Sequence, residues 1–348
     1  MHMADALLSP AVGGTMWAAS ALTIAYSSKK VRQELDDRKI PLMGVLGAFI
    51  FAAQMINFTI PATGSSGHLG GGLLLAILLG PYAAFLTIAS VLVVQALFFA
   101  DGGLLALGCN IFNMGFFPAF VVYPFIYKKL INNDPGRTRL AVATMIAAII
   151  GLQLGPLAVV LETLFSGISA LPLSTFLFLM QPIHLAIGVV EGIVTAGVVS
   201  FVYKARPDIL LGALQARPIG SHPLRKLLLA FLAAAILGGG ILSVFASKNP
   251  DGLEWAIARA TGKEEFKGSQ QGIHGALAAL QERLAFLPDY SFRKPAEHIN
   301  EGPKSESGKK MGDAGNLGTS VAGLVGAMLT LALAFLGGFL LKKRNQPA

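Results

Sequence analysis

The sequence predicts an all-α integral membrane protein with about nine transmembrane helices. Hydrophobic residues make up 54% of its 348 residues, and charged residues only 13%. The apolar residues fall into stretches of about 18 or more, the length at which a helix spans a bilayer. Lys and Arg gather between these stretches, as topogenic charges do. The formal net charge of +8 therefore indicates membrane orientation rather than nucleic-acid binding.

Eight apolar stretches are candidate spans, and one of them is interrupted. The stretches are residues 11–27, 42–60, 73–99, 104–127, 139–162, 174–203, 224–246 and 318–341. Residues 73–99 contain Gly80-Pro81 near the middle, and proline breaks a helix by removing a backbone donor and clashing with the preceding turn. We therefore expect two short passes there, hinged at Gly80 and Pro81.

The basic residues support this division of 73–99. With two passes, the basic connections all fall on one side of the membrane, whereas a single pass scatters them over both faces. These connections hold Lys29, Lys30, Arg32, Arg38 and Lys39, then Lys128, Lys129, Arg137 and Arg139, then Lys204, Arg206, Arg217, Arg225 and Lys226, and finally Lys342, Lys343 and Arg344. Because basic loops stay in the cytoplasm, the amino terminus is expected outside and the carboxyl terminus inside.

The first span differs from a signal peptide because its basic residues follow the apolar core instead of preceding it. We expect an uncleaved helix that keeps Met1 as an extracytoplasmic terminus. The loop 61–72 lies on the same side in this topology. His2 and His68 can therefore meet.

The chain is expected to divide into two modules. Residues 1–205 form a seven-helix domain, residues 206–223 a cytoplasmic linker with several prolines, and residues 224–341 a two-helix module. That module carries a polar extracytoplasmic segment, 247–317. Within this segment we expect helices at 251–260 and 272–287, a flexible tether from Arg293 to Asn316, and solvated surface histidines at 274 and 298.

Three residues form a candidate metal chelate. The Met1 amine, the His2 amide nitrogen and the His2 ring are nitrogen donors that favour a planar arrangement, and His68 supplies a fourth. Planar nitrogen sets suit Ni(II) or Cu(II). The glycines around His68 allow close backbone approach. From the residues alone, an exposed His2 and an interfacial His68 without metal remain an equal alternative.

Other polar residues fall inside the spans, where they face a bundle interior. Five are candidates to surround the metal cavity, or else to form hydrogen bonds between helices: Gln54, Asn57, Asp101, Asn110 and Asn113. His184 and Glu191 share a helix face and serve either an ion path or a structural or subunit contact. Glu162 is expected to be solvated at a helix end. Cys109, the single cysteine, is expected to be a small buried apolar residue.

Several motifs resemble one known family. These are residues 1–10 (MHMADALLSP), 61–69 (PATGSSGHL), 100–113 (ADGGLLALGCNIFN) and 184–192 (HLAIGVVEG). They are similar to the substrate-capture M component of energy-coupling-factor nickel/cobalt transporters, over about residues 1–205. Residues 249–255 (NPDGLEW) resemble the small two-helix N component, over about 224–341. The chain thus looks like a fusion of the two components.

The resemblance implies an ATP-driven uptake system in a prokaryotic inner membrane. It implies that the Met1 amine, His2 and His68 bind the transported Ni(II), or alternatively Co(II), in a cavity plugged by the amino terminus. It also implies a separate transmembrane coupling subunit and a cytoplasmic ATPase. Residues 302–310 depart from a phosphate-binding loop in spacing, so we expect no nucleotide bound by this chain.

Two other function classes are weighed against the capture subunit. A secondary transporter or channel would use Asp101, Glu162 and Glu191 as its ion path. A membrane enzyme would use His184 and Glu191 as acid and base, but the chain offers no cluster with the spacing of a nucleophile or metal hydrolase. We rank a transport subunit first and expect no enzymatic activity. Nickel is preferred over cobalt as cargo.

Overall fold

The structure is a computed structural model that describes residues 2–34, 36–131, 135–169, 171–220, 222–262, 271–293 and 311–342. Met1, His298 and most of the expected tether lie outside the described residues. The amino-terminal part holds one short 3-10 helix and nine further helical elements: η1 (Asp5–Leu7), α1 (Pro10–Glu34), α2 (Lys39–Gln54), α3 (Gly72–Leu79), α4 (Pro81–Phe99), α5 (Leu107–Ile111), η2 (Phe112–Tyr127), α6 (Lys128–Leu130), α7 (Arg137–Ser166) and α8 (Leu173–Ala205).

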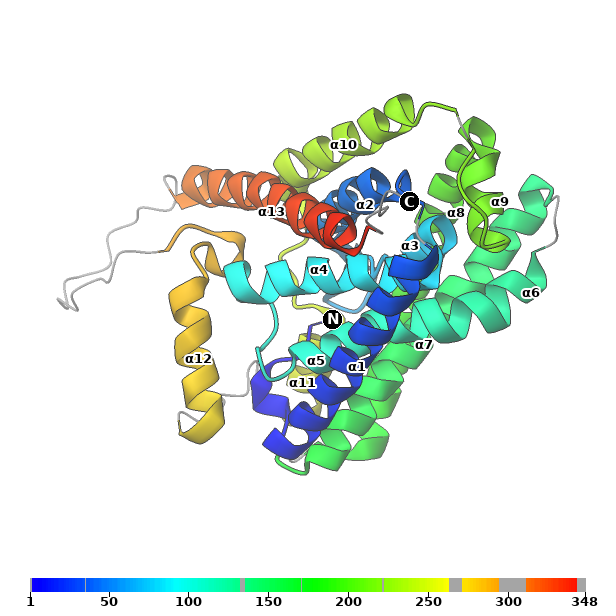
Figure 1. Cartoon of the computed structure of the whole chain (residues 1–348). Helices are drawn as coiled ribbons and strands as arrows, with labels where there is room; N and C mark the ends of the chain where they lie inside the picture. Colours follow the sequence, from blue (N-terminus) through cyan, green and yellow to red (C-terminus); the bar gives the residue numbers. More distant parts are fainter. Residues whose placement is uncertain are drawn as a thin grey trace.

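The remaining elements follow in the second part of the chain. They are α9 (Pro207–Leu214), α10 (Arg225–Gly240), η3 (Leu242–Phe245), α11 (Gly252–Thr261), α12 (Gly272–Leu284), η4 (Pro288–Tyr290) and α13 (Met311–Leu341). Figure 1 shows α10, α13 and α2 together on one side of the molecule, with α7 and α8 side by side on another. The predicted helical membrane fold is confirmed.

Five helices in the described part of the chain are long and apolar enough to cross a membrane. They are α4, the continuous helix 107–130 formed by α5, η2 and α6, then α7, α8 and residues 317–341 of α13. Large apolar side chains such as Phe165 and Phe178 are 73% and 76% exposed, as expected of lipid-facing positions. The count of nine stays a prediction.

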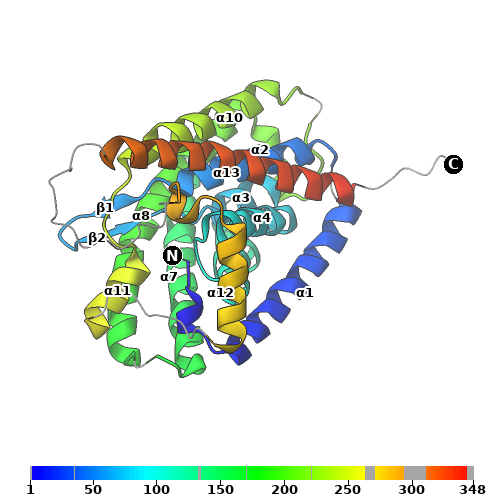
Figure 2. The same ribbon diagram turned by 90° about the vertical axis from the view of Figure 1, so that its left-hand side faces the viewer.

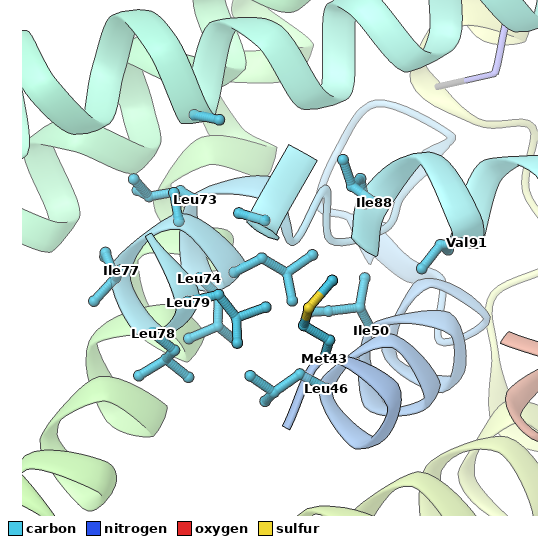
Figure 3. Close-up of a cluster of buried hydrophobic side chains, with 14 of the residues drawn as sticks. Met43, Leu46, Ile50, Leu73, Leu74, Ile77, Leu78, Leu79, Ile88 and Val91 are labelled. Atoms are coloured by element: carbon cyan, nitrogen blue, oxygen red, sulfur yellow. The ribbon is translucent and has the colours of Figure 1, made fainter. Parts of the chain in front are cut away.

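The break in 73–99 lies where the sequence places it. Gly80 has φ +84°, in the region that favours glycine, and separates α3 from α4, which begins at Pro81. At eight residues, α3 is only about 12 Å long, less than the roughly 30 Å of a bilayer core. Figure 3 shows α3 packed against α2 and α4 through Leu74, Ile50 and Ile88, so this short helix is buried inside the protein.

The span predicted at 42–60 is wrong at its end. Helix α2 stops at Gln54, and residues 58–60 form strand β1 (Phe58–Ile60), which pairs antiparallel with β2 (Ser65–Gly67). The apolar run alone could not distinguish the last helical turn from a short strand. This hairpin, visible beside α8 and α11 in Figure 2, carries the loop with His68 out of the α2 helix.

The two parts of the chain pack against each other. Helix α13 packs along α2, and α10 also contacts α2. The expected linker 206–223 contains α9 and is held by the first part: the Tyr123 hydroxyl donates to the Ala213 carbonyl (3.0 Å), and the Ile219 amide to Asp36 (2.8 Å). Among the glycines of α13, Gly323 meets Gly239, Gly326 meets Phe51 and Gly338 meets Ile40, whereas Gly337 faces open space.

Candidate metal centre

Three apolar residues of the amino-terminal segment are buried inside the protein. Met3, Leu7 and Leu8 are at most 1% exposed, because they pack under α5, α7 and α8. Asn110 accepts a hydrogen bond from the Met3 amide (2.8 Å), and the Met3 carbonyl accepts one from the Gly103 amide (2.9 Å). These contacts fix the backbone on the carboxyl side of His2.

The loop that carries His68 is held from two other helices. Gln54 of α2 donates through Nε2 to the Gly70 carbonyl (2.8 Å). Glu191 of α8 accepts from the Gly70 and Gly71 amides, at 2.6 and 3.0 Å. Gly71 has φ +77°, a conformation that favours glycine and lets both amides face one carboxylate. The glycine-rich composition therefore permits this turn.

The two histidines meet as the topology predicts. The His2 and His68 rings are stacked, with centroids 5.2 Å apart and planes 9° apart. Nδ1 of His2 lies 3.1 Å from Oδ1 of Asp101, while its Nε2 is buried with no hydrogen-bond partner among the described residues. Both rings line one cavity of about 460 Å³, together with Gln54, Asn57 and Asp101.

Burial keeps His68 neutral. It lowers the pKa of the His68 ring to about 3, so that at neutral pH the imidazole is uncharged. Nδ1 lies 3.0 Å from the Leu69 carbonyl, to which it donates in the tautomer that leaves Nε2 as the acceptor nitrogen. A neutral imidazole with an oriented second nitrogen is the form that binds a transition metal.

The motif 249–255 holds the hairpin from the second part of the chain. The Ser66 amide donates to the Pro250 carbonyl (2.8 Å), and its hydroxyl to the Asn249 carbonyl (2.8 Å). Ser66 and Asp251 form a parallel β-bridge, so the motif adds to the edge of the hairpin. The Trp255 indole donates to the Thr63 carbonyl (2.9 Å). The motif thus binds the hairpin at Ser66, two residues before His68.

Helix α12 and η4 cover the amino-terminal segment and Asp101. The Tyr290 hydroxyl donates to the Asp101 carboxylate, and Gln281 donates to the Gly102 carbonyl (2.7 Å). Although burial opposes ionisation of Asp101, the adjacent His2 ring and the Tyr290 hydroxyl hold the pKa of this carboxyl below its usual range. His274 lies with Nε2 2.9 Å from the Leu8 carbonyl, so it is an interface residue and not the solvated histidine expected.

The remaining sequence candidates fall into two groups. Gln54, Asn57 and Asp101 line the cavity beside His2 and His68, and Asn110 anchors the segment that carries His2. Asn113, His184 and Glu191 line a smaller cavity, on whose wall His68 also lies. His184 and Glu191 do not pair with each other, since His184 bonds the Met180 carbonyl and Glu191 the glycine amides.

The prediction for Glu162 is wrong, and two contributions to the metal site were not predicted. Glu162 is 6% exposed and accepts from Asn113 Nδ2 (2.9 Å), so it is not solvated at the helix end. The contacts of Tyr290 and of motif 249–255 with the site join segments far apart in the chain. Spacing along the sequence holds no signal for such contacts.

Comparison with known proteins decides the family. The family described as the cobalt uptake substrate-specific transmembrane region matches residues 2–209, and the PDGLE domain matches residues 225–343. The chain belongs to the cobalt uptake family. It is accordingly a membrane protein of the nickel/cobalt transport family, and the family predicted from its motifs is confirmed.

Relatives of known name agree with this assignment. The fused nickel transport protein NikMN of Rhodobacter capsulatus is 31% identical over 313 residues, which cover 84% of this chain and 88% of the relative. The cobalt transport protein CbiM of Geobacter sulfurreducens is 31% identical over 255 residues, covering 69% of this chain and 72% of the relative. A crystal structure of a truncated transition metal transporter is 32% identical, with TM-score 0.52, and covers 59% of this chain and 99% of the crystallised one.

Proposed function

We propose that the chain is the substrate-capture subunit of an ATP-driven nickel uptake system of the energy-coupling-factor type. The observation that carries this proposal is the stacking of His2 on His68, at 5.2 Å, beside a cavity of about 460 Å³. The ligands in this proposal are the Met1 amine, the His2 amide and ring, and His68. Met1 itself lies outside the described residues.

Nickel is the preferred cargo because all the proposed donors are nitrogen. Planar nitrogen coordination suits Ni(II), whereas zinc prefers tetrahedral sites. A fused chelate through the amine and the amide reaches the ring nitrogen nearer to the backbone, Nδ1. In the structure Asp101 holds that atom at 3.1 Å. In this proposal, binding of the metal ion to Nδ1 of His2 displaces the Asp101 carboxylate from that atom. Cobalt is the alternative cargo for the same site.

The surroundings of the site suit a cation. Four carboxylates line the cavity: Asp101, Asp251, Glu254 and Asp289, and Lys248 is the one Lys or Arg among its lining residues. Three of the four come from the second part of the chain. An excess of negative charge in a cleft raises the local concentration of cations and their rate of association. The second module thus contributes to capture in this proposal.

The opposite, basic end suits contact with cytoplasmic partners. Lys30, Lys39 and Lys128 line one cavity with Ala213, and Lys342 pairs with Asp37 at 2.6 Å. Segments far apart in sequence thus bring their basic residues together, which supports an external amino terminus and an internal carboxyl terminus. In this proposal a separate coupling subunit and ATPase dock there, and residues 1–205 and 224–341 act as M and N modules joined by 206–223.

Metal titration of the purified chain tests the site. We expect His2→Ala and His68→Ala each to weaken Ni(II) binding by at least about 100-fold, since each removes a direct ligand. One residue added ahead of Met1 moves the amine away and leaves both histidines in place. It should weaken binding comparably, and unchanged nickel affinity in the extended chain would show that the amine is not a ligand. The exposed His222→Ala is the control.

Uptake by proteoliposomes tests the mechanism. The chain alone should bind nickel but not accumulate it under an ion gradient, whereas vesicles that also hold the coupling subunit and ATPase should accumulate it when ATP is supplied. Gradient-driven accumulation by the chain alone would contradict the proposal and establish a secondary transporter. Parallel assays with Co(II) decide the cargo, because a cobalt system would accumulate Co(II) in preference to Ni(II).

A further inference from the structure

His68 lies between two cavities. The outer one, of about 460 Å³, also contains His2 and Asp101 in its wall. The inner one is about 30 Å³, and its polar lining residues are Asn113, His184, Glu191 and Asp251 besides His68. That volume accommodates one or two water-sized particles. A small ion on the His68 ring therefore borders a second space, away from the amino terminus.

Two side chains that line the inner cavity each hold a buried acceptor atom with no hydrogen-bond partner among the described residues. These atoms are Nε2 of His184 and Oδ1 of Asn113, on side chains that are 0% and 3% exposed. His184 Nδ1 lies 2.8 Å from the Met180 carbonyl, to which it donates, so Nε2 carries the lone pair. Asn113 donates through Nδ2 to Glu162, which orients Oδ1. Buried acceptors of this kind are costly and seldom left without partners.

We propose that the inner cavity is a second, transient site for the transported ion, with His68, His184 Nε2 and Asn113 Oδ1 as donors. The inference rests on the proposed capture of the ion by His2 and His68. Two imidazoles and one amide oxygen form a donor set that Ni(II) and Co(II) accept. Because His68 belongs to both sets, the ion passes inward by exchanging His2 and the amine for His184 and Asn113.

The composition of the inner site suits release. The described residues contain no group of three or more His, Cys, Asp or Glu that could hold a metal ion, so the site relies on an amide as its third donor. An ion in transit must bind well enough to enter and weakly enough to leave. Glu191 lies in the same wall, and its oxygens accept from the Gly70 and Gly71 amides.

Motif 249–255 closes this cavity from the second part of the chain. Gly252 lies in its wall, and a Cβ on Gly252 would be 3.0 Å from His184 Cε1 and 3.4 Å from His184 Nε2. The same Cβ would lie 2.7 Å from Ile183 Cγ2, so a side chain at this position requires α8 or the motif to shift. The second module therefore lines both the outer and the inner cavity.

The test is a Co(II) titration of the purified full chain, followed by the visible absorption of the bound ion. His184→Gln should bind within about threefold of the unaltered chain, because capture through His2 is intact. His2→Ala should bind at least about 100-fold more weakly, its residual binding coming from the inner site. The double variant His2→Ala with His184→Gln should lose about a further tenfold, the usual minimum for a lost metal contact. His222→Gln is the matched control.

The outcomes distinguish failure of the inner site from failure of the capture site. If the double variant binds as His2→Ala does, the inner site is refuted while capture by His2 stands. If His2→Ala alone leaves affinity unchanged, the proposed capture site fails. Should His184→Gln not give a folded chain, Asn113→Ser in the His2→Ala background makes the same measurement on the other donor. Equal residual binding with and without that substitution would overturn the proposal.

Discussion

Glu191 binds two consecutive backbone amides, those of Gly70 and Gly71, at 2.6 and 3.0 Å. A carboxylate can accept both bonds, whereas a glutamine amide offers one oxygen and turns its NH2 group toward the second donor. Each such hydrogen bond contributes about 0.5–1.5 kcal/mol, so the loss of one loosens the loop that positions His68.

Glu191→Gln is therefore expected to weaken Ni(II) binding by about tenfold, as loss of a residue that orients a metal ligand does. Isothermal titration of the purified variant measures it. Glu162→Gln is the matched control, since it alters another buried carboxylate that bonds Asn113 instead of the loop. Equal affinity in the two variants would mean that the loop does not depend on Glu191.

The histidines show how far single residues could be predicted. Charge distribution placed His2 and His68 on one side, and the structure brings their rings together. Asp101 and Gln54 were recognised as polar groups in apolar surroundings, and both line the cavity. Glu162 was misjudged because its position near a helix end suggested water, while the packing of Asn113 against it is a tertiary contact. Metal binding by these residues stays a prediction.

At the scale of elements, motif 249–255 is an isolated β-bridge followed by a helix start. Asp251 caps α11 by accepting from the Leu253 and Glu254 amides, at 2.8 and 2.9 Å, and the Glu254 side chain accepts from the Asp251 amide. This capping box fixes the direction of the chain as it leaves the hairpin. The helix at 251–260 was predictable from its pattern, but its docking on Ser66 was not.

Gly252→Ala should separate this motif from α8. The new Cβ would lie 2.7 Å from Ile183 Cγ2 and 3.0 Å from His184 Cε1, so one of the two elements must shift. Overpacking of this kind costs about 1–3 kcal/mol. We expect a lower melting temperature and weaker nickel binding. Gly197→Ala is the control, because Gly197 lies on α8 and faces open space. It should leave the melting temperature and nickel binding unchanged. Identical behaviour of the two variants would argue against the docking.

Helix ends were harder to predict than helices. Gly80 and Pro81 marked the break between α3 and α4 because each residue has a backbone reason to stand there. The end of α2 carried no such mark. Residues 55–60 are mostly apolar and suit either a helix or a strand, and the pairing of β1 with β2 decided in favour of a strand.

At the scale of the whole molecule, the two parts of the chain share an interface along α2 and α13. Gly326 of α13 lies against the Phe51 ring of α2, so closely that no Cβ fits without movement of the ring. Small residues at such crossings let membrane helices approach and gain van der Waals contact. The modular division of the sequence therefore coexists with tight packing.

Gly326→Val is expected to destabilise the full chain by at least about 1–3 kcal/mol, the usual cost of overpacking. Thermal unfolding in detergent measures this loss. Gly337→Val, about three turns further along α13 and with nothing within 4 Å, is the control and should unfold near the temperature of the unaltered chain. If both variants unfold together, α13 does not depend on close contact with α2.

The β-bridge between Ser66 and Asp251 also has a kinetic meaning. Motif 249–255 is tethered at both ends by α10 and α13, which themselves lie against α2. Such anchoring turns docking on the hairpin into an intramolecular event at high effective concentration. A motif that leaves the loop therefore returns at once, whatever the abundance of the protein in the membrane. Each return of the motif to the hairpin is therefore independent of diffusion between separate molecules.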